Sequence, residues 1–382
     1  MICFRKTLAL TIATGLGALP VSVSAATAKR AVFGTMPDGT AVQSVTLEGE
    51  NGVSVVLITL GATIQAFNVP DRMGAPADIT IGYDTVADYL RAPNYWGQTI
   101  GRYANRIAKG RFSLDGKPYQ ITLNNGANTL HGGKDGFDKR NWKLVSTEQK
   151  AGKAVAVMSL RSPDGDQGYP GNLDVTVTYA LDDTGSLTID FAARSDAPTV
   201  VNMTNHALFN LGGSGWPYGT YDQRLTIPAA SYSPVDAGLI PTGEKRPVAG
   251  TKFDFREGRM LHDGVRDGRD TQLVLGRGWD HNWVLDKGRT AEPQLAARLE
   301  HPASGRVLEV LSTEPGLQFY SGNFLTGELV GKGGQIYRMG DGIALEPQLF
   351  PDTPNQPAFG SARLDPGQTY RHTMIYRVSA RH

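Results

Sequence analysis

Alternation of apolar and polar residues with a period of two is the dominant pattern of the chain, and it predicts β-strands. The clearest case begins at Leu173, from which apolar residues occupy every second position as far as Leu181. After the turn sequence Asp-Asp-Thr-Gly, the alternation resumes from Leu187 to Ala193. A strand of this kind packs one face on a core and turns the other toward water or a thinner layer. The pattern therefore predicts an antiparallel hairpin.

Two shorter segments carry turn sequences that favour tight hairpins. Asn51-Gly52 lies between apolar runs at 41–47 and 53–60, and Asp115-Gly116 lies between runs at 111–114 and 119–123. Both dipeptides accept the positive φ angles that a tight hairpin turn requires. Further strands are expected at 307–311 and 371–378, whereas only residues 85–91 suggest a turn or two of helix.

Short strands and abundant turn residues favour an all-β fold with few short helices. The 382 residues include 46 glycines and 22 prolines, and no stretch keeps a 3.6-residue period for long. We expect a large antiparallel structure, a sandwich or a stack of sheets. All-β proteins often exceed about 200 residues as one domain. With no repeat or linker in view, one domain over residues 27–382 is expected, and the Gly-rich segment 212–221 is expected to be a surface loop.

Residues 1–26 predict an export signal. Arg5 and Lys6 give a positive start, residues 7–19 form a short apolar run, and small residues follow from 22 to 28. This order is typical of a secretory signal peptide, and the apolar run is short for a membrane span. We therefore expect a periplasmic protein, with secretion as the alternative and no membrane segment in the mature form.

Composition disfavours several classes of function. Lys and Arg total 38 against 37 for Asp and Glu, and no basic tract is interleaved with aromatics, so nucleic-acid binding is not expected. The single cysteine, Cys3, lies inside the predicted signal, so the mature chain offers no disulfide, thiol nucleophile or thiolate ligand. Motifs of serine hydrolases, P-loop nucleotide sites and zinc peptidases are missing from the sequence. The seven histidines show no metal-ligand spacing, so neither a metal nor a cofactor is expected.

Two histidines and a glutamate lie in contexts that suit proton transfer. His206 follows Asn205 after an apolar strand and precedes a Gly-rich loop, and His131 stands at a strand end before two glycines. Such a histidine can titrate near neutral pH, although a structural histidine bonded at the sheet edge is the commoner interpretation. Glu346 lies within an apolar strand, where partial desolvation would raise its proton affinity.

Other polar residues suit the recognition of sugar hydroxyls. Asn105 and Arg106 place an amide beside a guanidinium, and Asp280 lies between Trp279 and Trp283. A forked guanidinium and a carboxylate beside aromatic faces fit a pyranose ring, although a structural ion pair and two core tryptophans would explain the same residues. Each signal alone is weak, but no structural interpretation covers all of these segments.

Together the segments resemble the aldose 1-epimerase, or galactose mutarotase, family, from about residue 34 to the C-terminus. Six motifs in the family's order carry the resemblance. They are Gly-Arg-Tyr-Ala-Asn-Arg-Ile (101–107), Leu-His-Gly-Gly (130–133), Thr-Asn-His-Ala-Leu-Phe-Asn-Leu (204–211), Asp-His-Asn-Trp (280–283), Pro-Gly-Leu-Gln-Phe-Tyr-Ser-Gly-Asn (315–323) and Leu-Glu-Pro-Gln (345–348). The resemblance implies a β-supersandwich with an open cleft on one sheet face. It also implies a cofactor-free enzyme that interconverts the anomers of free hexoses such as glucose and galactose. We expect a monomer or a homodimer, and the sequence does not decide between them.

The resemblance further implies roles for individual residues. Glu346 would take the proton of the C1 hydroxyl while His206 protonates the ring oxygen, which opens the ring to the free aldehyde. After rotation about C1–C2, the same pair would close the ring on the other face. His131 would hold or polarise the region of the ring oxygen. The hydroxyl groups would be gripped by Asn105, Arg106, Asp280 and Gln318.

Three positions depart from the family pattern. Leu208 stands where an aromatic residue is usual, Trp283 where tyrosine is frequent, and Pro347 where threonine commonly follows the glutamate. None is the acid or the base, so activity is expected to survive, while the effect on sugar preference stays open.

Three other functions compete with this interpretation. An epimerase of phosphorylated hexoses would need a cluster of cations beside the cleft, which the sequence does not require. A non-catalytic carbohydrate-binding protein could keep the cleft, but both Glu346 and His206 are present. A lyase would need a base with a charge-neutralising partner, and a hydrolase would need two carboxylates spanning one bond, for which Asp280 and Glu346 are the candidates.

Overall fold

Three antiparallel sheets contain most of the strands in the computed structural model, which describes residues 1–2, 26–91, 94–150 and 152–381. The predicted signal therefore lies almost entirely outside the described residues. The first sheet has the order β1 (Thr27–Thr35), β2 (Ala41–Glu48), β3 (Ser54–Ile58), β4 (Thr63–Pro70), β5 (Pro76–Asp78). The second has the order β11 (Lys143–Lys150), β12 (Lys153–Ser162), β13 (Leu173–Asp182), β14 (Ser186–Ser195), β30 (Tyr370–Ala380), β24 (Arg306–Ser312), β23 (Gln294–Glu300), β18 (Arg224–Thr226), β21 (Arg259–Met260). The third has the order β17 (Leu208–Phe209), β28 (Ile343–Gln348), β25 (Gly316–Tyr320), β22 (Asp280–Val284), β19 (Ser231–Ser233), β20 (Arg246–Pro247).

Short strand pairs and helical turns connect these sheets. The pairs are β6 (Thr99–Ile100) with β16 (Thr204–Asn205), β7 (Arg106–Ile107) with β10 (Thr129–Leu130), β8 (Arg111–Leu114) with β9 (Lys117–Gln120), β15 (Thr199–Val200) with β29 (Arg363–Leu364), and β26 (Thr326–Val330) with β27 (Ile336–Arg338). The described α-helices are α1 (Val86–Arg91) and α2 (Thr271–Gly276). The 3₁₀ turns are Ala108–Gly110, Phe137–Lys139, Asp166–Gly168, Leu261–Asp263, Lys332–Gly334, Thr353–Asn355 and Pro357–Phe359.

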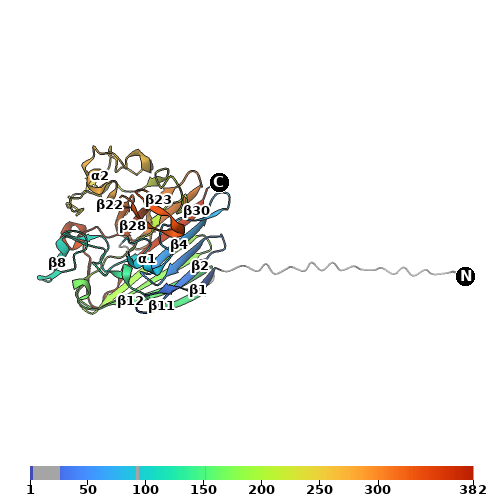
Figure 1. The fold of residues 1–382 in the computed structure, drawn as a ribbon, viewed down its shortest axis with the longest axis horizontal. Coiled ribbons are helices and arrows are strands. Elements are labelled where there is room, and N and C mark those ends of the chain that lie inside the picture. Colours follow the sequence, from blue (N-terminus) through green and yellow to red (C-terminus); the bar gives the residue numbers. More distant parts are fainter. Residues whose placement is uncertain (3–25, 92–93, 151, 382) are drawn as a thin grey trace.

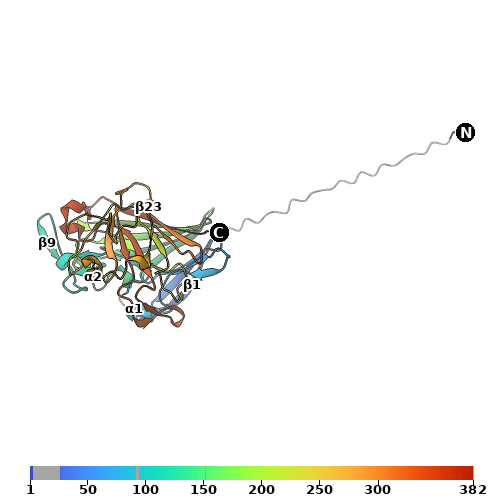
Figure 2. The same ribbon diagram turned by 90° about the horizontal axis from the view of Figure 1, so that it is seen from above.

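The sheets pack on one another, as the prediction of an all-β sandwich requires. The blue strands β1 and β2 of the first sheet lie beside the green strands β11 and β12 of the second sheet (Figures 1 and 2). Of the orange and red strands, β23 and β30 belong to the second sheet and β22 and β28 to the third. One apolar core runs between the layers and takes residues from Ala26 to Val378. The prediction of an all-β fold with few short helices is confirmed, whereas a single domain over 27–382 stays a prediction.

The three predicted hairpins are present, with small differences at their ends. Leu173 pairs with Ser195 and Leu181 with Leu187, and the apolar positions of both strands are buried in alternation. At the tightest turn, Asp115 and Gly116 have φ of 51° and 76°, the signs that a two-residue hairpin turn needs. The strand after this turn ends at Gln120 rather than residue 123, and the strand expected at 53–60 covers Ser54–Ile58.

The helical content is as small as the sequence predicts. The turn expected at 85–91 is α1, whereas α2 was not foreseen; it begins because the carboxylate of Asp270 accepts the N–H groups of Gln272 and Leu273. In the described part of the chain, a helix with the length and apolar character needed to cross a bilayer is absent. Segment 212–221 is built of turns, with Tyr218 68% exposed, as predicted for a surface loop.

Candidate active site

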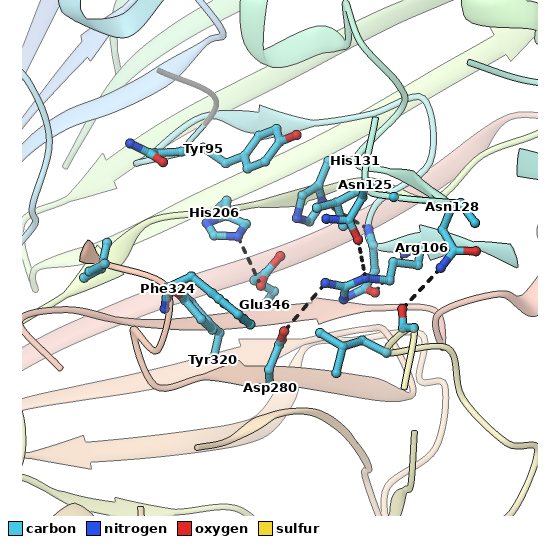
Figure 3. A pocket seen from close by; sticks show the side chains of 18 of the residues that line it. Tyr95, Arg106, Asn125, Asn128, His131, His206, Asp280, Tyr320, Phe324 and Glu346 are labelled. Atoms are coloured by element: carbon cyan, nitrogen blue, oxygen red, sulfur yellow. Dashed lines mark hydrogen bonds and ion pairs between the residues drawn. The ribbon is translucent and has the colours of Figure 1, made fainter. Parts of the chain in front are cut away.

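A cavity of about 480 Å³ opens on one face of the third sheet and collects most of the predicted site residues. Strands β22, β25 and β28 form its floor, and loops around residues 94–96, 105–106, 125–131 and 237–239 form its walls (Figure 3). Its size lies in the usual range of small-molecule pockets. Of the predicted residues, six line the cavity: Asn105, Arg106, His131, His206, Asp280 and Glu346.

Glu346 and His206 face each other at the centre of this cavity. The Nε2 atom of His206 lies 3.5 Å from Oε1 of Glu346, and both side chains are buried (Figure 3). Glu346 is held in the middle of β28, whose six residues are all buried. His206 follows β16, and its backbone is fixed by hydrogen bonds with the backbones of Gln98 and Gly97, each of 2.9 Å. The two residues therefore occupy rigid positions from which a proton can pass between them and a bound molecule.

His131 is fixed by a reciprocal contact with Asn105. The backbone N–H of Asn105 donates to Nδ1 of His131 at 3.1 Å, and the backbone N–H of His131 donates to the carbonyl of Asn105 at 3.0 Å. Because Nδ1 accepts a hydrogen bond, the neutral ring carries its proton on Nε2. His131 has a φ of 52°, in the left-handed region that non-glycine residues seldom adopt. It therefore offers an N–H donor, which suits an oxygen acceptor in the cavity.

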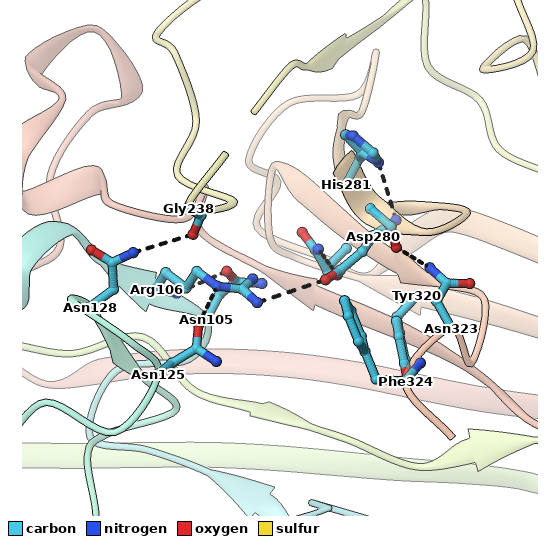
Figure 4. A network of polar contacts seen from close by, with 12 residues as sticks. Asn105, Arg106, Asn125, Asn128, Gly238, Asp280, His281, Tyr320, Asn323 and Phe324 are labelled. Carbon is cyan, nitrogen blue, oxygen red and sulfur yellow. Dashed lines mark hydrogen bonds and ion pairs between the residues drawn. The ribbon is translucent and has the colours of Figure 1, made fainter. Parts of the chain in front are cut away.

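A polar network joins the remaining predicted residues (Figure 4). Nη2 of Arg106 lies 3.8 Å from Oδ2 of Asp280, and Nε of Arg106 donates to Oδ1 of Asn125 at 3.1 Å. Gln318 lies beside the cavity rather than on its lining and donates from Nε2 to Oδ1 of Asp280 at 2.7 Å. Asn128 donates to the carbonyl of Gly238 at 3.2 Å and so ties two cavity walls together. The network orients Arg106 and Asp280 before any ligand binds.

Burial changes the proton affinity of the central groups in opposite directions. Burial, and then the negative charge of Asp280, raise the pKa of Glu346 well above its ordinary value. Burial lowers the pKa of His206 to about 4. The pKa of His131 is also held well below its ordinary value, first by burial, then because the adjacent imidazoles of His131 and His206 disfavour being charged together, and last by the positive charge of Arg106. When no sugar is bound, these opposite shifts favour a neutral Glu346 beside a neutral His206 over the ion pair, and the two forms contain the same number of protons.

Three buried polar atoms at the site have no hydrogen-bond partner among the described residues: Oε2 of Glu346, Nδ1 of His206 and Oε1 of Gln318. Buried polar groups in proteins are nearly always paired, and unpaired ones often mark a functional site. This group of atoms therefore indicates a place for a polar ligand.

Aromatic residues that were not predicted complete the cavity. Tyr95 packs against both histidines, while Tyr320 and Phe324 stack at the opposite side with ring centroids 6.1 Å apart. Tyr320 lies within one of the six motifs, so the motif could have pointed to it. Tyr95 and Phe324 carry no signal in a single sequence, because aromatic residues are equally frequent in cores.

The same site offers a set of atoms that could hold a metal. His131, His206 and Glu346 each present one donor atom, and these atoms lie within 4.8 Å of one another. Two imidazoles and a carboxylate are a donor set that Zn²⁺ accepts. The spacing of the histidines does not indicate this set, because the three residues are far apart along the chain. The absence of a resident metal stays a prediction.

The three residues that depart from the family pattern, Leu208, Trp283 and Pro347, do not line the cavity. Leu208 is fully buried in a small apolar cluster beside Trp96 and Ala344. Trp283 is fully buried in the main core and donates from Nε1 to the carbonyl of Phe253 at 3.0 Å. Trp279 is also fully buried, so both tryptophans beside Asp280 are core residues rather than a sugar platform.

Comparisons with known proteins agree with this site. The family model described as aldose 1-epimerase matches residues 43–377. A galactose mutarotase from Sus scrofa is 46% identical over 351 residues, which cover 92% of this chain and 98% of the relative. An aldose 1-epimerase from Escherichia coli (strain K12) is 37% identical and covers 90% of this chain and 97% of the relative. The crystal structure of a galactose 1-epimerase from Lactobacillus acidophilus NCFM superposes with a TM-score of 0.82 at 28% identity, covering 94% of this chain and 100% of that one. The chain belongs to the aldose 1-epimerase family.

Proposed function

We propose that the protein is an aldose 1-epimerase that interconverts the α and β anomers of free hexoses such as glucose and galactose. The observation that carries the proposal is the buried pair of Glu346 and His206, 3.5 Å apart, at the centre of a cavity lined by hydroxyl-binding groups. Relatives that are 37–46% identical over at least 90% of this chain are named galactose mutarotase or aldose 1-epimerase.

The reaction needs one group that accepts a proton and another that donates one. Glu346 removes the proton from the C1 hydroxyl as the C1–O1 double bond forms, and His206 delivers a proton to the ring oxygen as the C1–O5 bond breaks. Rotation about C1–C2 presents the other face of the aldehyde, and the same steps in reverse close the ring. A well-placed acid or base contributes about 10²–10⁴-fold each.

The buried pair contains the number of protons that this mechanism requires. In this proposal the pair carries one proton, and the raised pKa of Glu346 and the lowered pKa of His206 favour its place on the glutamate. Glu346 must be the anion and His206 the cation when the ring opens, so binding of the sugar must move this proton from one to the other. The ion-pair and the neutral forms contain equal numbers of protons, so no exchange with solvent is needed.

The other predicted residues suit the binding of a sugar ring. The Nε2–H group of His131 can donate to the ring-oxygen region, while Asn105, Arg106 and Asp280 offer donors and acceptors to hydroxyl groups. Gln318 supports Asp280. The reaction moves a proton and changes no oxidation state, so we expect no cofactor.

The site gives no support to a phosphorylated substrate. Among the described residues that line the cavity, Arg106 is the only Lys or Arg, and Asp280 already lies beside it.

The site does not support a hydrolase either. Asp280 is engaged with Arg106 and Gln318 rather than free to act as a second catalytic carboxylate.

The location of the protein belongs to the proposal as well. We propose export to the periplasm on the pattern of residues 5–28, with cleavage near residue 26. N-terminal sequencing of the protein from a periplasmic fraction tests this, and an intact N-terminus in the cytoplasmic fraction would refute it.

The oligomeric state is a separate question. Light scattering decides between the expected monomer and homodimer.

Polarimetry on fresh α-D-glucose and α-D-galactose tests the activity. We expect the wild-type protein to accelerate mutarotation and both Glu346→Gln and His206→Asn to lose about 10²-fold or more. Glucose 6-phosphate serves as the comparison substrate. A wild-type protein that binds these sugars but matches the buffer blank would be a carbohydrate-binding protein instead.

A further inference from the structure

Tyr95 packs against both imidazoles of the site. Its ring centroid lies 4.5 Å from that of His131, at an interplanar angle of 61°, and 5.8 Å from that of His206, at 43°. The two imidazoles are themselves 5.1 Å apart and nearly perpendicular. Figure 3 shows Tyr95 beside both histidines, with Glu346 on the far side of His206. The tyrosine therefore closes the side of the imidazole pair that does not face the glutamate.

The backbone and the hydroxyl group both hold Tyr95 in this position. Its φ of 56° is in the left-handed region, which is rare for a bulky aromatic residue and is kept only where the surroundings fix it. The next residue, Trp96, is buried and stacks on Tyr83 with centroids 4.4 Å apart. The phenol oxygen accepts a hydrogen bond of 3.4 Å from Nδ2 of Asn124.

Asn124 connects this contact to the loop that carries His131. Its side-chain oxygen accepts the N–H of Leu130 at 2.7 Å, and its amide donates to the carbonyls of Leu130 and Gly133. On the other side, the N–H of Gly97, two residues after Tyr95, donates to the carbonyl of His206. Tyr95 thus lies between the two segments that present the histidines.

We propose that Tyr95 is a positioning residue, whose ring fixes the relative orientation of His131 and His206 and keeps water from their outer faces. This inference rests on the proposed epimerase function, in which both imidazoles must act on one ring oxygen. The main contribution comes from the ring, because the hydroxyl group makes only a long hydrogen bond. Removing the ring opens a space that water can enter, and hydration favours the charged form of an imidazole.

Other charged groups also act on these imidazoles, and they remain in place when Tyr95 is changed. Glu346 faces His206 from β28, and Arg106 acts on His131 and Glu346 from β7. Asp280 acts on Glu346 from β22, and Asp138 in the 3₁₀ turn Phe137–Lys139 acts on Tyr95. A change in imidazole titration on removal of the ring would therefore report hydration and geometry rather than the loss of a charge.

The test compares Tyr95→Phe with Tyr95→Ala and uses Tyr218→Ala, an exposed tyrosine, as the control. Two quantities are measured: kcat with KM by polarimetry, and the His206 imidazole pKa by NMR titration, assigned with His206→Asn. We expect Tyr95→Phe to stay within about 3-fold of wild type. Tyr95→Ala should lose about 10–10²-fold in kcat and raise the His206 pKa by roughly one unit or more toward its ordinary value. If Tyr95→Ala does not fold, Tyr95→Leu replaces it with the same expectation.

The inference requires that Tyr95→Ala both lowers kcat and raises the His206 pKa. It is overturned if kcat of the ring-deleted variant stays within 3-fold of wild type, if the His206 pKa does not move, or if Tyr95→Phe is as impaired as Tyr95→Ala, since the hydroxyl group would then be the active part. A wild-type protein without epimerase activity would overturn the proposed function instead, and the NMR titration would still decide whether Tyr95 shields the imidazoles.

Discussion

Asn105 and His131 exchange two hydrogen bonds, one from each backbone N–H, and the contact at Nδ1 leaves Nε2 of His131 as the protonated nitrogen. The family resemblance alone does not give this tautomer, because it is set by the φ angles of 63° at Asn105 and 52° at His131, which turn the two backbones toward each other. A neutral imidazole with a fixed N–H suits donation to the ring oxygen. His131 does not have to change its protonation state for this role.

Replacement of His131 by alanine should therefore remove a donor without touching the acid–base pair. We expect a loss of about 10²-fold in kcat/KM, the lower end of the usual cost of removing one positioned donor. Polarimetry measures the loss, and ¹⁵N NMR of the wild-type protein should find the Nε2–H tautomer. The control is His262→Ala, which alters an exposed histidine. An Nδ1–H tautomer at His131 would contradict the geometry.

The dependence of activity on pH follows from the shared proton of Glu346 and His206. Below about pH 4 His206 takes up a second proton, so the pair has no base and the rate falls. At high pH the pair loses its only proton, and because the pKa of Glu346 is raised, this loss occurs above the ordinary range of a carboxyl group. We expect a bell-shaped profile of kcat/KM, measured after subtraction of the buffer-catalysed rate. A single rise near pH 6.5 would instead indicate an imidazole with an ordinary pKa and would refute the shared-proton description.

Asp280 lies on β22, two strands from Glu346 in the same sheet, and sets part of that profile. After burial, its negative charge is the next contribution that raises the pKa of Glu346. Asp280→Asn keeps an acceptor for the amide of Gln318 but removes the charge, so the pKa of Glu346 should fall and the alkaline limb should move to lower pH. We also expect KM to rise about 10-fold, because Arg106 loses its ion-pair partner and its orientation. Asp174→Asn, an exposed carboxylate on β13, is the control, and an unmoved alkaline limb in Asp280→Asn would contradict the assignment.

Much of the fold can be predicted from periodicity and turn chemistry, because these are local properties. The hairpin of β13 and β14 is specified by alternation alone. In the hairpin of β8 and β9, Asp115-Gly116 specifies the turn through the φ angles that the two residues accept. The order of strands in the nine-stranded sheet cannot be predicted from these local properties. There β30 lies between β14 and β24, a pairing of distant segments that no local pattern encodes.

The candidate site shows where a single motif stops being informative. Arg102 and Arg106 belong to one seven-residue motif, yet only Arg106 reaches the cavity. Arg102 is fully buried on the other side, where its guanidinium donates to the carbonyls of Pro170 and Gly171 and to the hydroxyl group of Ser162. Sequence spacing cannot separate these roles, because the left-handed conformation at Asn105 alters the direction of the chain between them. The structure therefore divides the motif into a structural half and a ligand-binding half.

Asp138 provides a test of stability that is separate from catalysis. Its side chain is buried, Oδ1 has no hydrogen-bond partner among the described residues, and burial raises its pKa to about 7. A carboxyl group whose pKa is raised in the folded state stabilises the fold when the pH is below its unfolded-state pKa, near 3.8. This contribution to the free energy of unfolding is lost as the pH rises to the folded-state pKa of about 7. Asp138→Asn is neutral at every pH, so its stability relative to wild type should increase by about 2–4 kcal/mol between pH 3.5 and pH 8. Urea unfolding at both pH values measures this difference, and the acid destabilisation caused by buried histidines cancels because both proteins share it.

Asp135→Asn, which changes an exposed carboxylate three residues away, should show no such trend. A relative stability of Asp138→Asn that stays constant with pH would mean that the Asp138 carboxyl is solvated in the folded protein.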